Sequence, residues 1–416
     1  MDSKIIRVAA LFLLSLFFST GCWDRQEVEN QAYVVAIGMD VVPGDPAGRI
    51  ITFQLVIPAK LGVGGQGGGG SGEKSYFQTS VKASSIYEAR DLLQASVSRQ
   101  ISLLQCRAVL FSDELARRSI LSGVRVAERS QELRRSLFFA IIDGTAQEFL
   151  QKNQPLLNVN ITKYYEEIAQ ANKYTGYSTT SSFQSTIEGV ESSGEAAVVT
   201  YAGLGNNLLD APLTKSETGK IRADGSDLPR QGGTKGNWIG VAVFKGDKMV
   251  GKLDKLEAET LNMLRGDFES GPFEVQDPMQ PKYLNGVNLR QVGKPQIRVD
   301  LSSDPVRLDV RMEFEGNLMS EFGGTDYTVL ENRDKLERAA QKEIEEQTAE
   351  VITKAQELKT DIFSFGNSAV KKHFWTWQEW EKFNWPEKFS KADIRVSARV
   401  KIRFFGLQNG PSQTAH

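Results

Sequence analysis

The chain has 416 residues, a formal net charge of −2, a hydrophobic content of 40% and a charged content of 25%. These values are typical of globular protein, and the balanced charge argues against a nucleic-acid partner or a polybasic membrane patch. The chain contains two cysteines and two histidines. That supply is too small for a disulfide framework or a thiolate metal cluster, so we expect no cofactor and no metal site.

The first residues have the layout of a secretory signal peptide. The basic residues Lys4 and Arg7 precede an apolar run at 8–18, and small residues at 19–21 precede Cys22. The apolar run is too short for a comfortable membrane span. We predict a bacterial lipoprotein signal, with residues 1–21 removed and a diacylglycerol attached to Cys22. Two acyl chains make such an attachment stable, so the chain would need no transmembrane helix.

Two alternatives to lipidation stay open. Ser19 occupies the position, three residues before the cysteine, where a lipobox usually has leucine. An ordinary cleaved signal with Cys22 just beyond the cut would have the same zones, and so would an uncleaved anchor helix. No later stretch approaches the roughly 18 to 20 apolar residues that span a bilayer. The length after residue 21 predicts two or three domains.

Residues 22–155 are predicted to form an N-terminal α+β domain. Strands at 31–40 and 49–57 form a hairpin with a long loop, and a flexible glycine-rich segment follows at 60–74. The remaining elements are strands at 75–81, 106–111 and 137–142, and helices that begin at Ser85, Ser112 and Thr145. The sequence GVGGQG at 62–67 matches a dinucleotide fingerprint, but the helix that the mechanism requires does not follow it.

A middle domain is predicted at residues 156–290. It includes a loop or linker at 206–235, where apolar residues are few. A hairpin at 238–253 turns at Gly246 and Asp247, and a helix begins at Asp254.

A C-terminal α+β domain is predicted at residues 291–407, followed by a tail at 408–416. Strands are expected at 296–301, 306–314 and 393–405, the last with one apolar and one basic face. The longest helical pattern runs from 332 to 359, with an apolar stripe at Leu336, Ala340, Ile344, Val351, Ala355 and Leu358. A coiled-coil partner and a sheet are both possible neighbours for this stripe. We favour the sheet because the stripe spans only about four heptads.

Four of the six tryptophans lie between residues 373 and 389: Trp375, Trp377, Trp380 and Trp385. Core packing between the long helix and the last strand is the favoured interpretation, because an exposed aromatic patch of this size is unusual. A partner-docking patch and a membrane-interface contact are the alternatives.

The chain is not predicted to be an enzyme. The only internal histidine, His373, lies beside Phe374 and Trp375, with no recognisable nucleophile motif nearby. Nucleophilic catalysis by a serine or cysteine triad needs a histidine that a third group positions.

Three blocks resemble the C-subunit lipoproteins of spore germinant receptors, the Ger(x)C or GerAC-like family. The first is Cys22-Trp23-Asp24 with Glu27 and the strand AYVVAIGMD. The second is GVAVFKGDKMVG at 240–251. The third runs from Asp361 through Phe365 and Gly366 into the tryptophan-rich segment and the last strand.

The resemblance implies a three-domain α+β lipoprotein on the outer side of the spore inner membrane. It implies a non-catalytic subunit that acts with integral membrane A and B subunits in a receptor that senses nutrients and triggers germination. Lipid is expected on Cys22. The candidate interaction or structural residues are Trp23, Asp24, Glu27, Asp361, Phe365, Gly366, Trp375, Trp377 and Trp380. The alternative function is a solute-binding lipoprotein that captures a nutrient itself.

Overall fold

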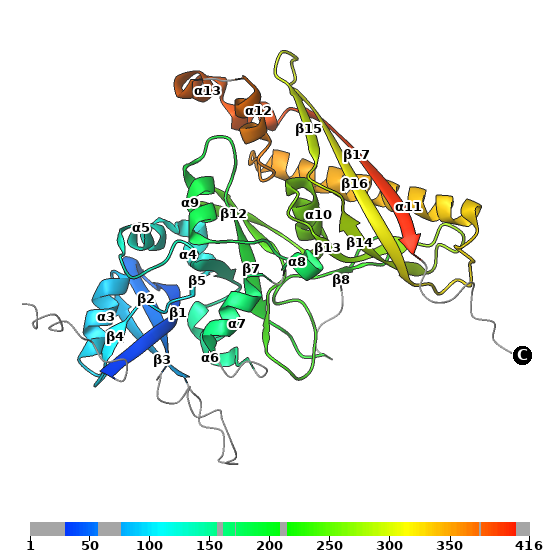
Figure 1. Cartoon of the computed structure of the whole chain (residues 1–416). Coiled ribbons are helices and arrows are strands. Elements are labelled where there is room, and N and C mark those ends of the chain that lie inside the picture. The colour runs from blue at the N-terminus through cyan, green and yellow to red at the C-terminus, as the bar shows by residue number, and fades with distance from the viewer. Residues whose placement is uncertain are drawn as a thin grey trace, which may run out of the picture.

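The computed structural model describes residues 30–56, 76–155, 161–170, 172–208, 214–373 and 376–404. Within these residues, a large mixed sheet and a smaller C-terminal sheet are packed with helices (Figure 1). The predicted α+β class is therefore confirmed. The predicted signal peptide, Cys22, the glycine-rich segment and the tail at 408–416 lie outside the described residues.

The large sheet has ten strands among the described residues, in the order β12-β11-β7-β6-β5-β1-β2-β3, with β10 paired to β7 and β4 to β1. Strands β1, β5, β6 and β7 are parallel neighbours, whereas the outer hairpins are antiparallel. The strands are β1 Gln31–Val42, β2 Asp45–Val56, β3 Tyr76–Ala83, β4 Gln100–Ser102, β5 Ala108–Ser112, β6 Phe138–Ile142, β7 Val198–Leu204, β10 Gly236–Asn237, β11 Val241–Lys245 and β12 Lys248–Leu253.

Helices cover both faces of this sheet, because its parallel central strands are apolar on both sides. One core joins the sheet to α3, α4, α5 and α9 around Phe111 and Phe139. The other joins it to α6 and α7 around Phe149 and Tyr165. The helices are α3 Ile86–Gln94, α4 Asp113–Arg118, α5 Leu121–Arg129, α6 Ala146–Lys152, α7 Ile161–Ile168, α8 Asn172–Thr175 and α9 Phe183–Glu191.

One detail of the N-terminal prediction is wrong. The first hairpin turns tightly instead of through a long loop, since Val42 pairs with Asp45 and Gly44 has a φ of 79°. Glycine adopts such an angle without a steric penalty. The helical stretch expected from Ser112 is divided, since α4 ends at Arg118 and α5 begins at Leu121. There, the amide of Ile120 donates to the carbonyl of Asp247 in the β11–β12 turn, which holds the break in place.

The C-terminal sheet has the order β13-β14-β16-β15, with β17 paired to β16. Strand β17 is parallel to β16 because the intervening helices carry the chain back to the same end of the sheet. The strands of the C-terminal sheet are β13 Ser270–Gln276, β14 Leu284–Gln291, β15 Gln296–Asp300, β16 Arg307–Ser320 and β17 Asp393–Phe404. The helices are α10 Lys255–Arg265, α11 Leu330–Glu357, α12 Phe365–His373, α13 Trp377–Phe383 and α14 Trp385–Phe389.

Helix α11 spans 28 residues, or about 42 Å at 1.5 Å per residue. Its stripe from Leu336 to Ala355 is buried against the C-terminal sheet and α10, so the sheet prediction is confirmed. Glu337, Glu343 and Thr348 of the same helix are also buried. None of the described helices is both long and apolar enough to span a bilayer.

The hydrogen-bonded sheet continues past residue 155, where the first domain was predicted to end. Strands β7, β11 and β12 extend the sheet that β1 to β6 begin. The C-terminal core also includes Val198, Val241 and Leu253 from these strands. The predicted domain borders stay predictions. The large sheet extends across the one at 155, and β14 runs across the one at 290.

Candidate functional site

Asp361 lies in the turn between α11 and α12 and is the centre of a buried junction. Its Oδ1 accepts a hydrogen bond from the amide of Phe363 at 3.0 Å. Its Oδ2 accepts from the amide of Gly366 at 2.7 Å and from the indole Nε1 of Trp385 at 2.8 Å. One carboxylate therefore fixes the start of α12 and the orientation of a tryptophan 24 residues further along the chain.

Burial raises the pKa of Asp361 to about 6, and the hydrogen bonds from Gly366, Trp385, Phe365 and Phe363 partly oppose that rise. A buried carboxylate is stabilised only where donors surround it, as these backbone amides and the indole surround Asp361.

Gly366 is a glycine because the junction leaves no room for a side chain. A Cβ at this position would lie 2.7 Å from Nε1 of Trp385 and 2.8 Å from Cα of Gly194. The close approach of Gly366 to Gly194 brings the segment before β7 against the start of α12. Two further contacts join the same segments: the amide of Ala196 donates to the carbonyl of Asp361 at 2.8 Å, and Ser364 bonds to Glu195.

Aromatic rings fill the space around this junction. Trp380 and Trp385 are stacked with centroids 5.6 Å apart, and Phe363 stacks on Phe365 at 5.1 Å. All four are buried, and they belong to the C-terminal core. The core-packing interpretation is therefore confirmed for Trp380 and Trp385. Figure 1 shows α12 and α13 at the end of α11 that lies away from its first turn.

The structure brings together four of the candidate residues predicted from the sequence: Asp361, Phe365, Gly366 and Trp380. Trp377 lies on the solvent side of α13, with 60% of its surface exposed. Trp385 completes the junction. The candidates Cys22, Trp23, Asp24, Glu27 and Trp375 lie outside the described residues.

The two tryptophans of α13 are expected to respond differently to truncation. Trp380→Ala removes a buried ring and should lower the free energy of unfolding by about 3–5 kcal/mol. Trp377→Ala removes an exposed ring and should change it by about 0.5 kcal/mol or less. Urea unfolding of both variants checks this prediction, and equal losses would contradict it.

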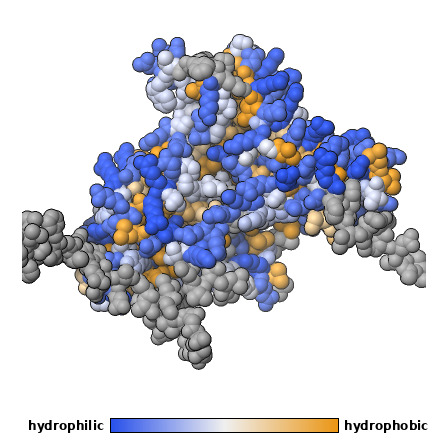
Figure 2. All heavy atoms as spheres, in the orientation of Figure 1, coloured by the Kyte–Doolittle hydropathy of each residue, from blue (hydrophilic) through white to orange (hydrophobic). Residues whose placement is uncertain are grey.

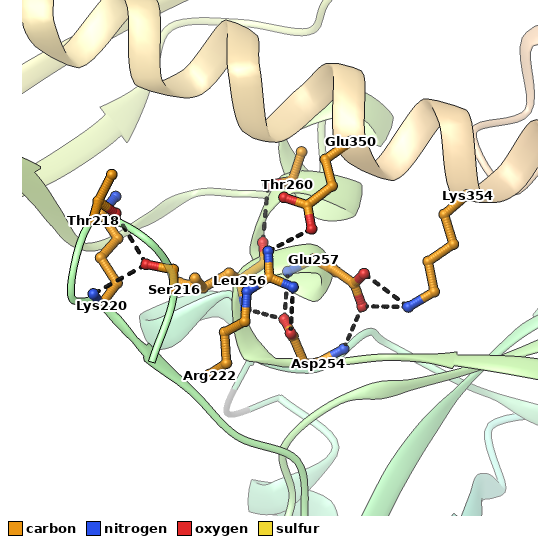
Figure 3. A network of polar contacts seen from close by, with 10 residues as sticks. All are labelled: Ser216, Thr218, Lys220, Arg222, Asp254, Leu256, Glu257, Thr260, Glu350 and Lys354. Carbon is orange, nitrogen blue, oxygen red and sulfur yellow. Dashed lines mark hydrogen bonds and ion pairs between the residues drawn. The ribbon is translucent and has the colours of Figure 1, made fainter. Parts of the chain in front are cut away.

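A second buried polar cluster lies where α10, α11 and residues 214–224 meet (Figure 3). Strands β8 Thr214–Lys215 and β9 Ile221–Arg222 form a short hairpin there. The segment at 206–235 was predicted as a loop or linker; this part of it is packed into the fold, because Lys220, Ala223 and Asp224 are buried. The composition of the segment did not indicate this packing, since its ion-pair partners Lys252, Asp254 and Glu343 lie far away along the chain.

Lys220 is the most deeply buried charge of the cluster, with 1% of its side chain exposed. Its Nζ lies 2.9 Å from Oε1 of Glu343 and 4.0 Å from the centre of the Phe273 ring. Burial lowers the pKa of Lys220, and the nearby Glu343 and Glu259 act against that change. The pair ties the 214–224 segment to the middle of α11.

Exposed and half-buried ion pairs surround this core. Arg222 bridges Asp254 at the start of α10 and Glu350 of α11, as Figure 3 shows. Asp254 caps α10 by accepting from the amides of Leu256 and Glu257. Lys354 of α11 pairs with Glu257 at 2.7 Å. A polar pocket of about 490 Å³ opens beside the network, with Arg222, Glu343 and Glu350 among its lining residues.

Glu259 of α10 should make stability depend on pH. Burial raises its pKa to about 8 from an ordinary value of 4.5, while Lys220 and Lys255 act in the opposite direction. The folded chain therefore binds this proton more tightly than the unfolded chain. The resulting stabilisation is complete below the ordinary pKa and is lost as the pH rises through about 8.

Glu259→Gln should consequently flatten the fall in melting temperature between about pH 5 and about pH 8. The measurement compares thermal unfolding of the variant and the parent chain across that range. Parallel curves would show that Glu259 does not bind the proton in the folded state.

Comparison with known protein families matches both halves of the chain. The sequence model described as "Spore germination protein N-terminal domain" matches residues 24–204. The model described as "Spore germination B3/ GerAC like, C-terminal" matches residues 239–406. The two matches occur in order and span most of the chain, so the chain belongs to the GerAC-like family of spore germination proteins. The residues between them, 205–238, include the segment that packs against α10 and α11.

Similar proteins match over nearly their whole length. Spore germination protein KC of Bacillus subtilis (strain 168) is 24% identical over 97% of this chain and 97% of its own. Spore germination protein YndF of the same organism is 24% identical over 98% and 99%, and spore germination protein B3 is 23% identical over 93% and 94%. A solved structure, "Crystal Structure of the GerBC protein", is 18% identical, with 89% of this chain and 98% of that chain covered and a TM-score of 0.47.

Proposed function

We propose that the chain is a non-catalytic, lipid-anchored subunit of a nutrient-germinant receptor that triggers spore germination. The observation that carries the proposal is the ordered match of both family domains over most of the chain. Full-length relatives that are named spore germination proteins support it. In this role the chain acts with integral membrane A and B subunits.

The proposed location is the outer face of the spore inner membrane, with a diacylglycerol on Cys22 as the anchor. The basic, apolar and small-residue zones before Cys22 support an anchor at this position. Anchoring in the plane of the membrane raises the effective concentration of the chain near membrane partners. Affinity for those partners can then be modest.

The proposed work of the folded part is to present a protein surface in a fixed shape. The Asp361 junction and the Lys220 cluster support this role, because each ties distant segments together through buried hydrogen bonds or ion pairs. Trp377, exposed beside the junction, is the candidate contact residue for a membrane subunit. A pull-down of membrane partners from solubilised spores, with the parent chain and Trp377→Ala as baits, tests this assignment.

Cys22→Ala should release the chain from the membrane and weaken the germination response. Cys106→Ala is the matched control, because it removes the other cysteine of the sequence. The Cys106 thiol is buried, and burial raises its pKa to about 12, so it is poorly suited to acylation. Fractionation of spore membranes gives the readout. If Cys22→Ala stays membrane-bound and germination is unchanged, the anchor proposal fails.

The second candidate function is a solute-binding lipoprotein. The polar pocket beside Arg222 and Glu350 favours it, since its volume of about 490 Å³ would admit a small nutrient molecule. Calorimetry with amino acids and sugars on the chain from Cys22 onward decides between the two functions. Saturable binding that is lost in Arg222→Ala would promote the second candidate.

A further inference from the structure

The face of the C-terminal sheet that α11 does not cover is polar and rich in arginine. From Arg307 to Asn317, alternate residues of β16 point away from the core, and every one of them is polar or charged. The strand register places Arg298 of β15 beside Asp309 of β16, and Asp309 beside Arg395 of β17. Figure 1 shows these three strands side by side.

Several guanidinium groups on this outer face are free to bind a ligand. Three arginines form no ion pair with the described part of the chain: Arg298, Arg311 and Arg399. Arg307 differs from them, because the strand register places it between Asp300 and Asp393. The carboxylates of Asp309 and Glu313 lie on either side of Arg311 along β16, and the register places them beside Arg298 and Arg399. A guanidinium presents a planar fork of donors that matches two oxygens of a phosphate group.

One end of this face carries exposed apolar side chains instead. At the end of β16 and the start of α11, Met319, Phe322 and Leu330 are 71%, 66% and 58% exposed. We call residues 319–330 the apolar loop. Gln280 Nε2 donates to the carbonyl of Gly323 and so fixes this loop to the β13–β14 turn. Figure 2 shows hydrophobic side chains at the end of the molecule where α11 begins, against a mostly hydrophilic surface.

We propose that the outer arginine face and the apolar loop together contact an anionic phospholipid surface. An interface with another protein would be expected to have apolar or aromatic residues at its centre. Here the centre is charged and the apolar residues lie at one end. That arrangement suits a bilayer surface, where arginines meet headgroup phosphates while Met319 and Phe322 enter the boundary with the acyl chains. The contact goes beyond the proposed function, because it requires no lipid on Cys22.

The test measures vesicle binding by the chain from Cys22 onward, with Cys22→Ser so that no acyl chain can be attached. The vesicles contain equal parts of phosphatidylglycerol and phosphatidylcholine, or phosphatidylcholine alone. We expect binding to the anionic vesicles only, weakened by added salt. The triple variant Arg298→Gln, Arg311→Gln, Arg399→Gln should bind them about a hundredfold more weakly than the parent chain. Met319→Ser with Phe322→Ser should also reduce binding.

The matched control removes the same charge from the other end of the molecule, through Arg118→Gln, Arg125→Gln and Arg129→Gln on α4 and α5. It should bind like the parent chain. The proposal is overturned if the parent chain ignores anionic vesicles or binds both kinds alike. It is also overturned if the arginine-face variant binds like the control. Saturable binding of soluble polyglutamate by a parent chain that ignores the anionic vesicles would assign the face to an acidic polypeptide instead.

Discussion

Gly366→Ala is expected to lower the free energy of unfolding by about 3 kcal/mol and to loosen the junction between the two sheets. The added Cβ would lie 2.8 Å from Cα of Gly194 and 2.7 Å from Nε1 of Trp385. Neither neighbour can move easily. The backbone beside Gly194 is held by the bond from Ala196 to Asp361, and the indole is held by the Asp361 carboxylate.

Urea unfolding measures how much free energy of unfolding Gly366→Ala loses. The near-ultraviolet circular dichroism of the tryptophans reports whether the surroundings of Trp385 change. Gly144→Ala is the control. Gly144 has a φ of 85°, and no atom lies within 4 Å of the position that an added Cβ would take, so that variant should cost only about 1 kcal/mol of backbone strain. An equal loss in both variants, with an unchanged tryptophan signal, would show that the close approach at Gly366 does not constrain the fold.

Lys220→Met is expected to destabilise the chain by about 3–5 kcal/mol, because it leaves the Glu343 carboxylate buried without its cation. Glu343→Gln should also be destabilising, because it leaves the Lys220 ammonium buried without its carboxylate. The double variant should recover most of the loss, since it removes both buried charges together. The free energies of unfolding of the four chains form a double-mutant cycle that isolates the pair.

The matched control is an exposed ion pair on the same helix. Lys335 and Glu331 lie 2.7 Å apart, one turn from each other, near the start of α11. The cycle of Lys335→Met and Glu331→Gln should give a coupling of about 0.3–0.5 kcal/mol, because solvent screens this pair. Additive losses for Lys220 and Glu343 would mean that the buried contact contributes no coupling to the fold.

The elements with a clear periodicity could be predicted from the sequence. The apolar stripe of α11 and the alternation of β17 each repeat over many residues, and both elements form close to the expected bounds. The hairpin around Gly246 was also predictable, because the turn residues lie between two apolar runs. Each of these patterns is formed by residues that lie close together in the sequence, so it can be recognised without knowledge of the fold.

The roles of individual tryptophans were not predictable. Trp377 and Trp380 are three residues apart in one aromatic segment, yet one is exposed and the other buried. The difference depends on which side of the short helix α13 faces Trp385 of α14. A helix of seven residues offers too little repetition to reveal that side in advance.

The sequence by itself determined the α+β class, the family resemblance and the candidates Asp361, Phe365 and Gly366, because these depend on local order and short motifs. Only the tertiary structure decided that Asp361 holds Trp385 and that Gly366 meets Gly194. It also decided that Lys220, in a segment with the composition of a linker, is buried against Glu343. The physical reason is that burial of a charge or a glycine depends on partners many residues away, which no local pattern records.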